Sequence, residues 1–370
     1  MLSVILNKEV QRQSLEKMES KKTTIITFSC IFAIVLWYTG YASFPLAFAD
    51  ETYSFVTKWG TLGNYDGMLN VPASITIDPA GNVYVTDTNN NRIEKFSSDG
   101  KFLSKWGTYG SGNGQFDLPT SIAIDGHGNV YVSDQSNNRV EEFDGSGNYI
   151  QQFNLTQYYP ARIAVDSSGD IYFSDPTKNI VGKFSNEGQA IAKWGTYGTD
   201  NGQFDTPTGI AIDSVGNVYV ADTGNNRIDE FSSDGQFIDK WGTMGTGNGQ
   251  FNSPQGIAVD SVGDVYVTDN GNDRVEKFTS TGQFITKFGA PGTNNGQFGA
   301  PSGIAVDSSG DVYVSDASED HPSIQEFSIS NSTENTAKST VPEFGATTLF
   351  ALTAAIISLV IFTRKTSIKT

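Results

Sequence analysis

The sequence has 370 residues, of which 39 are glycine, 37% are hydrophobic and only 18% are charged. This composition is typical of a turn-rich β protein. The formal net charge of −17 argues against nucleic-acid binding, because contacts with the phosphate backbone depend on Lys and Arg side chains.

The first 49 residues predict an export signal. Lys21 and Lys22 precede an apolar run at 25–37, and the small-residue site Ala47-Phe-Ala49 follows it. This order marks a secretory signal peptide. An uncleaved N-terminal membrane segment is the alternative, and both predict an apolar helix at this end. Met18 is a second candidate for the start of the chain.

Residues 50–328 consist of six copies of one repeat. Two motifs, Ile/Val-x-Ile/Val-Asp and Tyr-x-x-Asp, recur at intervals of 47 residues, apart from one interval of 41. The aspartates that end the first motif are Asp78, Asp125, Asp166, Asp213, Asp260 and Asp307. Those that end the second are Asp87, Asp134, Asp175, Asp222, Asp269 and Asp316. Self-similarity at a fixed long period indicates a repeat architecture.

Each copy predicts four short strands. In the copy that starts at Trp194, apolar runs of period two at 209–213, 217–221, 227–231 and 236–241 are separated by Gly/Asn/Asp/Ser turns. A sustained 3.6-residue period is absent from the repeats. The sequence therefore predicts an all-β fold, a six-bladed β-propeller built from four-stranded antiparallel blades.

The two ends of the array are incomplete in complementary ways. Residues 53–59 read as a fourth strand with no first three before it, and residues 302–328 supply three strands with no fourth after them. We therefore expect the N-terminal strand at 53–59 to complete the last blade. Closing the ring in this way protects the seam, where an unpaired strand edge would otherwise remain.

The repeat motif runs P-x-G-I-A-V-D, then G-x-V-Y-V-x-D-x-x-N-x-R-I-x-x-F, then G-x-F-I-x-K-W-G. It resembles the NHL repeat, and the resemblance covers residues 53–328 in all six copies. The resemblance implies the propeller fold. Some animal NHL propellers bind RNA through basic faces, and the acidic composition of this chain differs from theirs.

Repeated polar residues predict structural roles. Arg92, Arg139, Arg227 and Arg274 recur at one position, where they can pair with the aspartates of the Tyr-x-x-Asp motifs. The aspartates that end the innermost strands either cap their own turns or form a ring that attracts a cation. No loop has the acidic spacing of a recognised calcium motif. We therefore expect no cofactor, with Ca²⁺ or another divalent cation as the alternative.

Candidate binding residues lie where a copy departs from the repeat. Between the second and third blades, 157–160 replaces the glycine-rich loop, and Arg162 stands where other copies have Gly or Ser. This shortening predicts that Tyr158, Tyr159 and Arg162 are exposed beside the channel mouth, and Tyr and Arg are enriched in binding hot spots. Drift in a tolerant loop is the alternative explanation.

Two further altered turns add candidates of the same kind. Lys178 lies in the turn at 176–180, and His321 lies in the turn at 318–322 of the last blade. Asn154 and Asn331 each begin an Asn-x-Thr sequon and are candidates for N-glycosylation.

The sequence offers little for catalysis. Its two histidines, His127 and His321, fall at different points of the repeat, and no innermost strand carries one. H-E-x-x-H, G-x-S-x-G and P-loop motifs are missing. Cys30, the one cysteine, lies in the N-terminal apolar run. The sequence favours a protein- or glycan-binding scaffold over an enzyme. A propeller enzyme, namely a channel-metal hydrolase or lyase, and a purely structural envelope component are the alternatives.

The C-terminal region predicts a surface anchor. A polar linker at 329–340 is followed at 341–370 by Val341-Pro-Glu-Phe-Gly345, an uncharged run at 346–363, and basic residues. The run is long enough to span a bilayer, and the basic residues place the C-terminus inside. This order is similar to the PEFG-type sorting signals of archaeal surface proteins. That resemblance implies cleavage by an archaeosortase-like enzyme and transfer to a lipid anchor, whereas a retained transmembrane helix is the alternative. Both predict a propeller on the outer face of the cell membrane.

Overall fold

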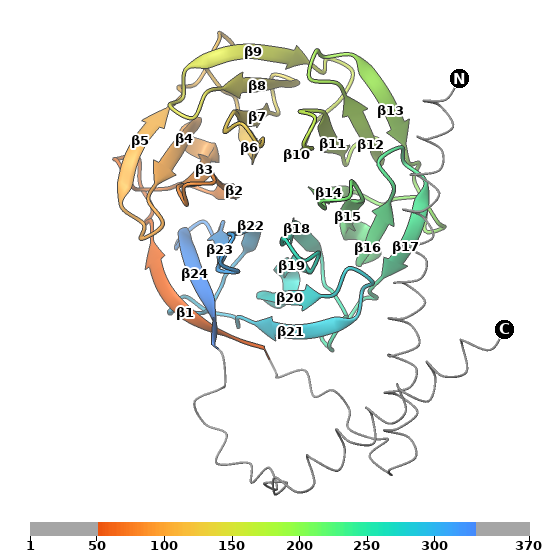
Figure 1. Cartoon of the computed structure of the whole chain (residues 1–370). Helices are drawn as coiled ribbons and strands as arrows, with labels where there is room; N and C mark the ends of the chain where they lie inside the picture. The colour runs from red at the N-terminus through yellow and green to blue at the C-terminus, as the bar shows by residue number, and fades with distance from the viewer. Residues whose placement is uncertain (1–50, 331–370) are drawn as a thin grey trace, which may run out of the picture. The chain divides into compact units, whose positions relative to one another are not determined.

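The computed structural model describes residues 51–330, which form six four-stranded antiparallel sheets around a central channel (Figure 1). The predicted six-bladed, all-β propeller is therefore confirmed. Within residues 51–330 no helix is long and apolar enough to cross a bilayer. The apolar helices expected at both chain ends, the sorting signal and the linker from residue 331 onward lie outside the described residues. Ile329 and Ser330, which were expected to begin the linker, instead belong to the last strand, Ser323–Ser330.

Five blades run outward in chain order, from an innermost strand beside the channel to an outermost one. Blade 1 is β2 (Pro72–Ile77), β3 (Val83–Asp87), β4 (Arg92–Phe96) and β5 (Phe102–Trp106). Blade 2 is β6 (Pro119–Ile124), β7 (Val130–Asp134), β8 (Arg139–Phe143) and β9 (Tyr149–Asn154). Blade 3 is β10 (Arg162–Val165), β11 (Ile171–Asp175), β12 (Ile180–Phe184) and β13 (Ala190–Trp194). Blade 4 is β14 (Pro207–Ile212), β15 (Val218–Asp222), β16 (Arg227–Phe231) and β17 (Phe237–Trp241). Blade 5 is β18 (Pro254–Val259), β19 (Val265–Asp269), β20 (Arg274–Phe278) and β21 (Phe284–Phe288).

Blade 6 combines the two ends of the array. Its inner strands are β22 (Pro301–Val306), β23 (Val312–Asp316) and β24 (Ser323–Ser330), and its outermost strand is β1 (Thr52–Trp59). The pairing of β1 with β24 is antiparallel and extends from Thr52 opposite Ser330 to Trp59 opposite Ile324. The expected closure of the ring by the N-terminal strand is therefore confirmed.

The hydrophobic core lies between the blades. Each of its six clusters joins the apolar faces of neighbouring sheets, and the cluster at the seam packs Val83 of blade 1 against Tyr313 and Ile324 of blade 6. Trp59 of β1 packs against this cluster, 6.1 Å from the ring of Phe96. Because burying each such side chain contributes about 1.5–3 kcal/mol, the blades stabilise one another as a ring.

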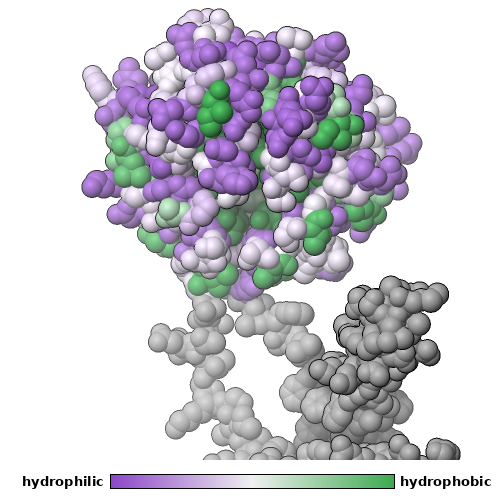
Figure 2. Space-filling view, turned by 45° about the horizontal axis from the view of Figure 1, so that its top comes forward, coloured by the Kyte–Doolittle hydropathy of each residue, from purple (hydrophilic) through white to green (hydrophobic). Residues whose placement is uncertain are grey.

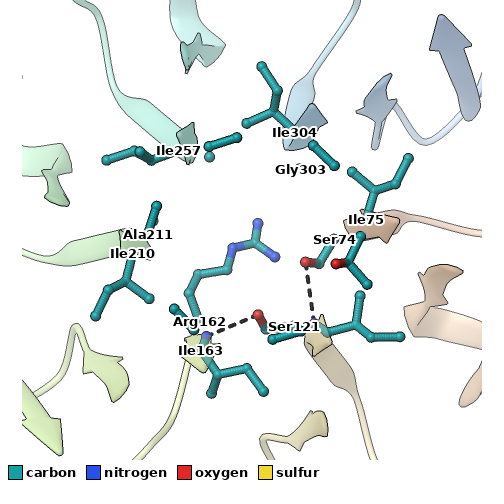
Figure 3. A pocket seen from close by; sticks show the side chains of 18 of the residues that line it. Ser74, Ile75, Ser121, Arg162, Ile163, Ile210, Ala211, Ile257, Gly303 and Ile304 are labelled. Carbon is teal, nitrogen blue, oxygen red and sulfur yellow. Dashed lines mark hydrogen bonds between the residues drawn. The ribbon is translucent and has the colours of Figure 1, made fainter. Parts of the chain in front are cut away.

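The innermost strands of blades 4, 5 and 6 approach their neighbours closely through glycines. A Cβ atom at Gly209 would lie 2.1 Å from the carbonyl oxygen of Gln255, and one at Gly256 would lie 2.2 Å from that of Ser302. Blades 1 and 2 have Ser74 and Ser121 at this position instead. The Ser121 hydroxyl accepts a hydrogen bond from the Ile163 amide of the next blade at 3.0 Å (Figure 3).

The surface is mostly hydrophilic. On the face shown in Figure 2, hydrophobic side chains are scattered among polar ones. Several of the exposed apolar side chains occupy the glycine-rich loops, namely Tyr109, Tyr197 and Met244, each more than 70% exposed.

Candidate functional site

The repeated arginines have structural roles, as the sequence analysis proposed. Arg92 forms ion pairs with Asp87 at 2.6 Å and with Glu94 at 2.8 Å, and all three side chains are almost completely buried. The same guanidinium donates to three carbonyl groups of the glycine-rich loop at 64–68. Equivalent ion pairs join Arg139 to Asp134, Arg227 to Asp222 and Arg274 to Asp269. These charges hold loops in place and are not free to bind a ligand.

The aspartates at the ends of the innermost strands are also engaged in their own turns. Asp78 accepts hydrogen bonds from the amides of Ala80 and Asn82 at 2.9 and 2.8 Å, and Asp213 accepts from Val215 and Asn217 in the same way. Residues 51–330 contain no cluster of three or more His, Cys, Asp or Glu side chains that could hold a metal ion.

The shortened loop between blades 2 and 3 differs from the expectation. Tyr158 is half-buried and turns toward the core, where its ring centroid lies 5.0 Å from that of Phe173 and 6.2 Å from that of Phe184. The expectation that Tyr158 is exposed is wrong. With the glycine-rich loop missing, the tyrosine ring packs against the blade in its place.

The other candidates around this loop do not gather at one site. Tyr159 is half-buried, and its backbone amide donates to Asp175 at 3.0 Å. Lys178 is exposed, with its ammonium group 4.9 Å from the centre of the Tyr158 ring. His321 is exposed and is not among the residues that line the channel. Asn154 is exposed, whereas Asn331 lies outside the described residues.

Arg162 alone among the candidates enters the channel. It begins β10 of blade 3, and its side chain points across the channel axis (Figure 3). Nη2 donates to the hydroxyl of Ser302 on the opposite blade 6 at 2.7 Å. Nη1 donates to the carbonyl of Thr120 on blade 2. One side chain therefore spans the channel and links blades that are far apart around the ring.

The residue that receives Arg162 belongs to a polar network. The Ser302 hydroxyl donates either to the carbonyl of Ala73 at 3.0 Å or to the amide oxygen of Gln255 at 3.2 Å. Beyond this polar level, the channel lining consists largely of Ile, Ala and Val from the six innermost strands. The cavity has a volume of about 300 Å³.

The charge of Arg162 has no counterion in the described protein. No carboxylate of residues 51–330 lies within ion-pair distance of its guanidinium, which distinguishes it from the repeated arginines. Desolvation lowers the pKa of Arg162 to about 10, so the group remains charged at neutral pH. An unpaired, desolvated guanidinium is costly, and an anion placed beside it would be bound favourably.

The sequence identified Arg162 but not its partners. Arginine at a position that is otherwise Gly or Ser is a visible departure from the repeat. The register of six blades places blade 3 opposite blade 6, which is the signal that could have pointed to Ser302. Thr120 contributes only its carbonyl group, so no side-chain pattern could have revealed its role.

Comparison with known proteins identifies the family. No curated protein matches the sequence. A solved streptogramin B lyase is 18% identical with a TM-score of 0.54, over 75% of this chain and 98% of that one. Virginiamycin B lyase from Staphylococcus aureus is 17% identical with a TM-score of 0.52, over 75% of this chain and 99% of that one. A gluconolactonase from Xanthomonas campestris is 16% identical with a TM-score of 0.54, over 78% and 94%. At these identities the likeness shows the propeller fold. The family profile itself matches residues 50–322, and the chain therefore belongs to the virginiamycin B lyase family.

Proposed function

We propose that the protein is a propeller enzyme of the lyase or lactone-hydrolysing kind, and that its substrate binds where Arg162 crosses the channel. Membership of a family named for a lyase supports the reaction class, as do structural neighbours named as lyases and as a gluconolactonase. The observation that carries the location is the unpaired guanidinium of Arg162 inside the channel. This reading replaces the scaffold favoured by the sequence as the first candidate.

The chemistry of ring opening fits a fixed cation. When a cyclic ester is opened, its acyl carbon becomes a carboxylate and negative charge develops on the acyl oxygens. Elimination keeps both ester oxygens on that carbon, whereas in hydrolysis the ring oxygen leaves as an alcohol and water supplies the second oxygen. Arg162 can donate parallel N–H groups to such a pair of oxygens, because a guanidinium matches carboxylate geometry. Thr120 and Ser302 hold it in place before a substrate arrives. Preorganised charge of this kind is often the largest contribution to catalysis.

The remaining chemistry would differ from that of the solved lyase. A histidine-to-alanine variant of the Staphylococcus aureus enzyme, solved with quinupristin, is catalytically inactive. In the described part of this chain, both histidines are exposed on loops outside the channel lining. Catalysis at Arg162 would therefore not depend on a histidine, and we do not assign the substrate of that enzyme to this one.

A binding module is the second candidate, and the absence of a histidine from the channel lining within residues 51–330 favours it. A channel with one cation, no histidine and no metal-binding cluster within residues 51–330 can hold a ligand without transforming it. In this reading the propeller presents a rigid face to a protein or glycan. The apolar runs at 25–37 and 346–363 support a position at the outer surface of the cell membrane for either candidate.

The two candidates are separated by turnover of cyclic esters. The purified full-length protein would be incubated with quinupristin and, separately, with gluconolactone, and the products followed by liquid chromatography and mass spectrometry. Elimination gives a product of unchanged mass and altered retention, whereas hydrolysis adds the mass of one water. Turnover that disappears in an Arg162→Met variant supports the enzyme. If neither ester is consumed above the spontaneous rate, the binding module becomes the better reading.

A further inference from the structure

We propose that the guanidinium of Arg162 is a binding site for a carboxylate carried on a small apolar body. This inference rests on the channel location proposed above and names the chemical class of the ligand. It does not require that the ligand be transformed.

The first argument is the contrast with the repeated arginines. Arg92 and Arg274 each pair with two buried carboxylates, so their charge is neutralised within the blade. Arg162 has only neutral acceptors, a carbonyl and a hydroxyl group. The rest of its N–H groups have no acceptor within residues 51–330. A carboxylate would supply both the missing charge and the missing acceptors.

The second argument is the size and polarity of the cavity. About 300 Å³ lies at the small end of the range for ligand pockets. The lining next to Arg162 is provided by residues such as Ile163, Ile210 and Ala211 (Figure 3). A ligand that fits this lining has one charged end and a hydrocarbon or aromatic remainder.

The third argument concerns the charge of the ligand. Among residues 51–330, the channel lining contains a single cation, and the mouth where the innermost strands end is rimmed by aspartates such as Asp78 and Asp213. A polyanion would be repelled by this rim and only partly neutralised by one guanidinium. A single negative charge matches a single positive charge, which favours a carboxylate over a phosphate ester.

The fourth argument is that Ser302 can release Arg162 without losing its own hydrogen bond. Its hydroxyl already has Ala73 and Gln255 as acceptors, at 3.0 and 3.2 Å. A carboxylate that takes the Nη2 donor from Ser302 therefore leaves no buried hydroxyl unpaired. The exchange replaces a hydrogen bond from the guanidinium to a neutral hydroxyl with hydrogen bonds to an ionised carboxylate, in which both partners carry charge.

The test uses benzoate as the probe and benzamide as its neutral isostere. Binding to the purified full-length protein would be measured by isothermal titration calorimetry, with inorganic phosphate as the competing anion. We expect saturable binding of benzoate, and binding of benzamide and phosphate weaker by at least about tenfold. We expect Arg162→Met to weaken benzoate binding by at least about tenfold as well.

Lys178→Gln is the matched control, because it removes a cation from the neighbouring exposed turn without altering the channel. It should leave benzoate affinity within about twofold. Arg162→Lys, which keeps the charge but not the forked donors, should bind with intermediate affinity. Arg162→Lys replaces Arg162→Met as the test variant if the methionine variant does not fold, as judged by near-ultraviolet circular dichroism.

The proposal is overturned if Arg162→Met or Arg162→Lys binds benzoate like the unmodified protein, or if benzamide or phosphate binds as tightly. These outcomes are separate from those of the turnover assay. Benzoate binding that needs Arg162, without consumption of any ester, would sustain this site and remove the enzyme. Ester turnover that is unaffected by benzoate and by Arg162→Met would show an enzyme, but it would remove both this carboxylate site and Arg162 as the place where the ester binds.

Discussion

Glu94 and Gln325 occupy equivalent positions in blades 1 and 6 and accept the same backbone hydrogen bond. The amide of Gly67 donates to Glu94 at 3.1 Å, and the amide of Gly296 donates to Gln325 at 2.9 Å. Both side chains are fully buried. The last blade therefore shows that a neutral side chain can hold this loop, while blade 1 uses a carboxylate for the same purpose.

We predict that stability falls as the pH rises from about 4.5 to above 7. Burial raises the pKa of Glu94, Glu141, Glu276 and Asp229 to about 7 each, although a nearby arginine opposes the shift. The folded state then binds more protons than the unfolded state, so the stabilisation is complete below the unfolded pKa and is lost as the pH passes the folded one. Urea unfolding between pH 5 and pH 8 measures this slope.

The glutamine of blade 6 suggests the variant that isolates this effect. Replacing Glu94, Glu141 and Glu276 together with Gln should flatten the slope between pH 5 and pH 8. Glu187→Gln, at an exposed carboxylate, should leave the slope unchanged. An equal slope in the triple variant would show that other groups, or the net charge, govern the pH dependence.

We predict that removing residues 53–59 abolishes the cooperative unfolding of the ring. Without β1, the edge of β24 is unpaired, and Trp59 and Tyr53 no longer cover the clusters at blades 1 and 5. Thermal unfolding followed by near-ultraviolet circular dichroism should become broad and begin at lower temperature. Val56→Ser changes an exposed position of the same strand. It should unfold as sharply as the unmodified protein, with a free energy of unfolding that differs by less than about 0.5 kcal/mol. A truncated chain that melts as sharply and as high would contradict closure as the source of cooperativity.

Arg92→Ala should destabilise the protein by about 3–5 kcal/mol, because it leaves the buried carboxylate of Asp87 without its ion-pair partner and removes the donor that faces Glu94. It also frees the loop at 64–68, so limited proteolysis should cut there first. Lys105→Ala, which breaks an exposed ion pair with Asp66, should cost less than about 1 kcal/mol. Denaturant unfolding of the two variants measures how much stability each one loses. Equal losses of stability would argue against the buried ion pairs as the cause.

Gly256→Ala should cost at least about 1–3 kcal/mol, because the added Cβ would overlap the backbone carbonyl of Ser302 on the next blade. The equivalent position in blade 1 already carries a side chain, so Ser74→Ala should cost only about 1 kcal/mol, through the lost hydrogen bond to the Ile122 amide. Urea unfolding of both variants tests the difference. A Gly256→Ala variant as stable as the unmodified protein would show that the blades can separate at little cost.

The fold could be predicted from the sequence because the pattern of strands and turns recurs in six copies. Strand alternation, turn residues and the unmatched ends at 53–59 and 302–328 were enough to predict blade number and closure. The pairing of Arg92 with Asp87 followed from their recurrence. Such features are local or periodic, so they can be recognised from the order of the residues along the chain.

The site was less accessible to this reasoning. Arg162 stood out by its type, but the hydrogen bond to Ser302 joins residues on opposite sides of the ring. Tyr158 was expected at the surface, although it fills the volume that a missing loop leaves beside Phe173. Both depend on distances across the fold that the spacing of residues along the chain does not encode.

Because Thr52 is paired with Ser330, the propeller starts and finishes at one point on its circumference. A tether joined to either terminus would therefore be attached at the edge of blade 6. New ends could likewise be cut into any other turn, with the old ones spliced together by a short bridge. A circularly permuted chain of this kind should form the same ring of six blades.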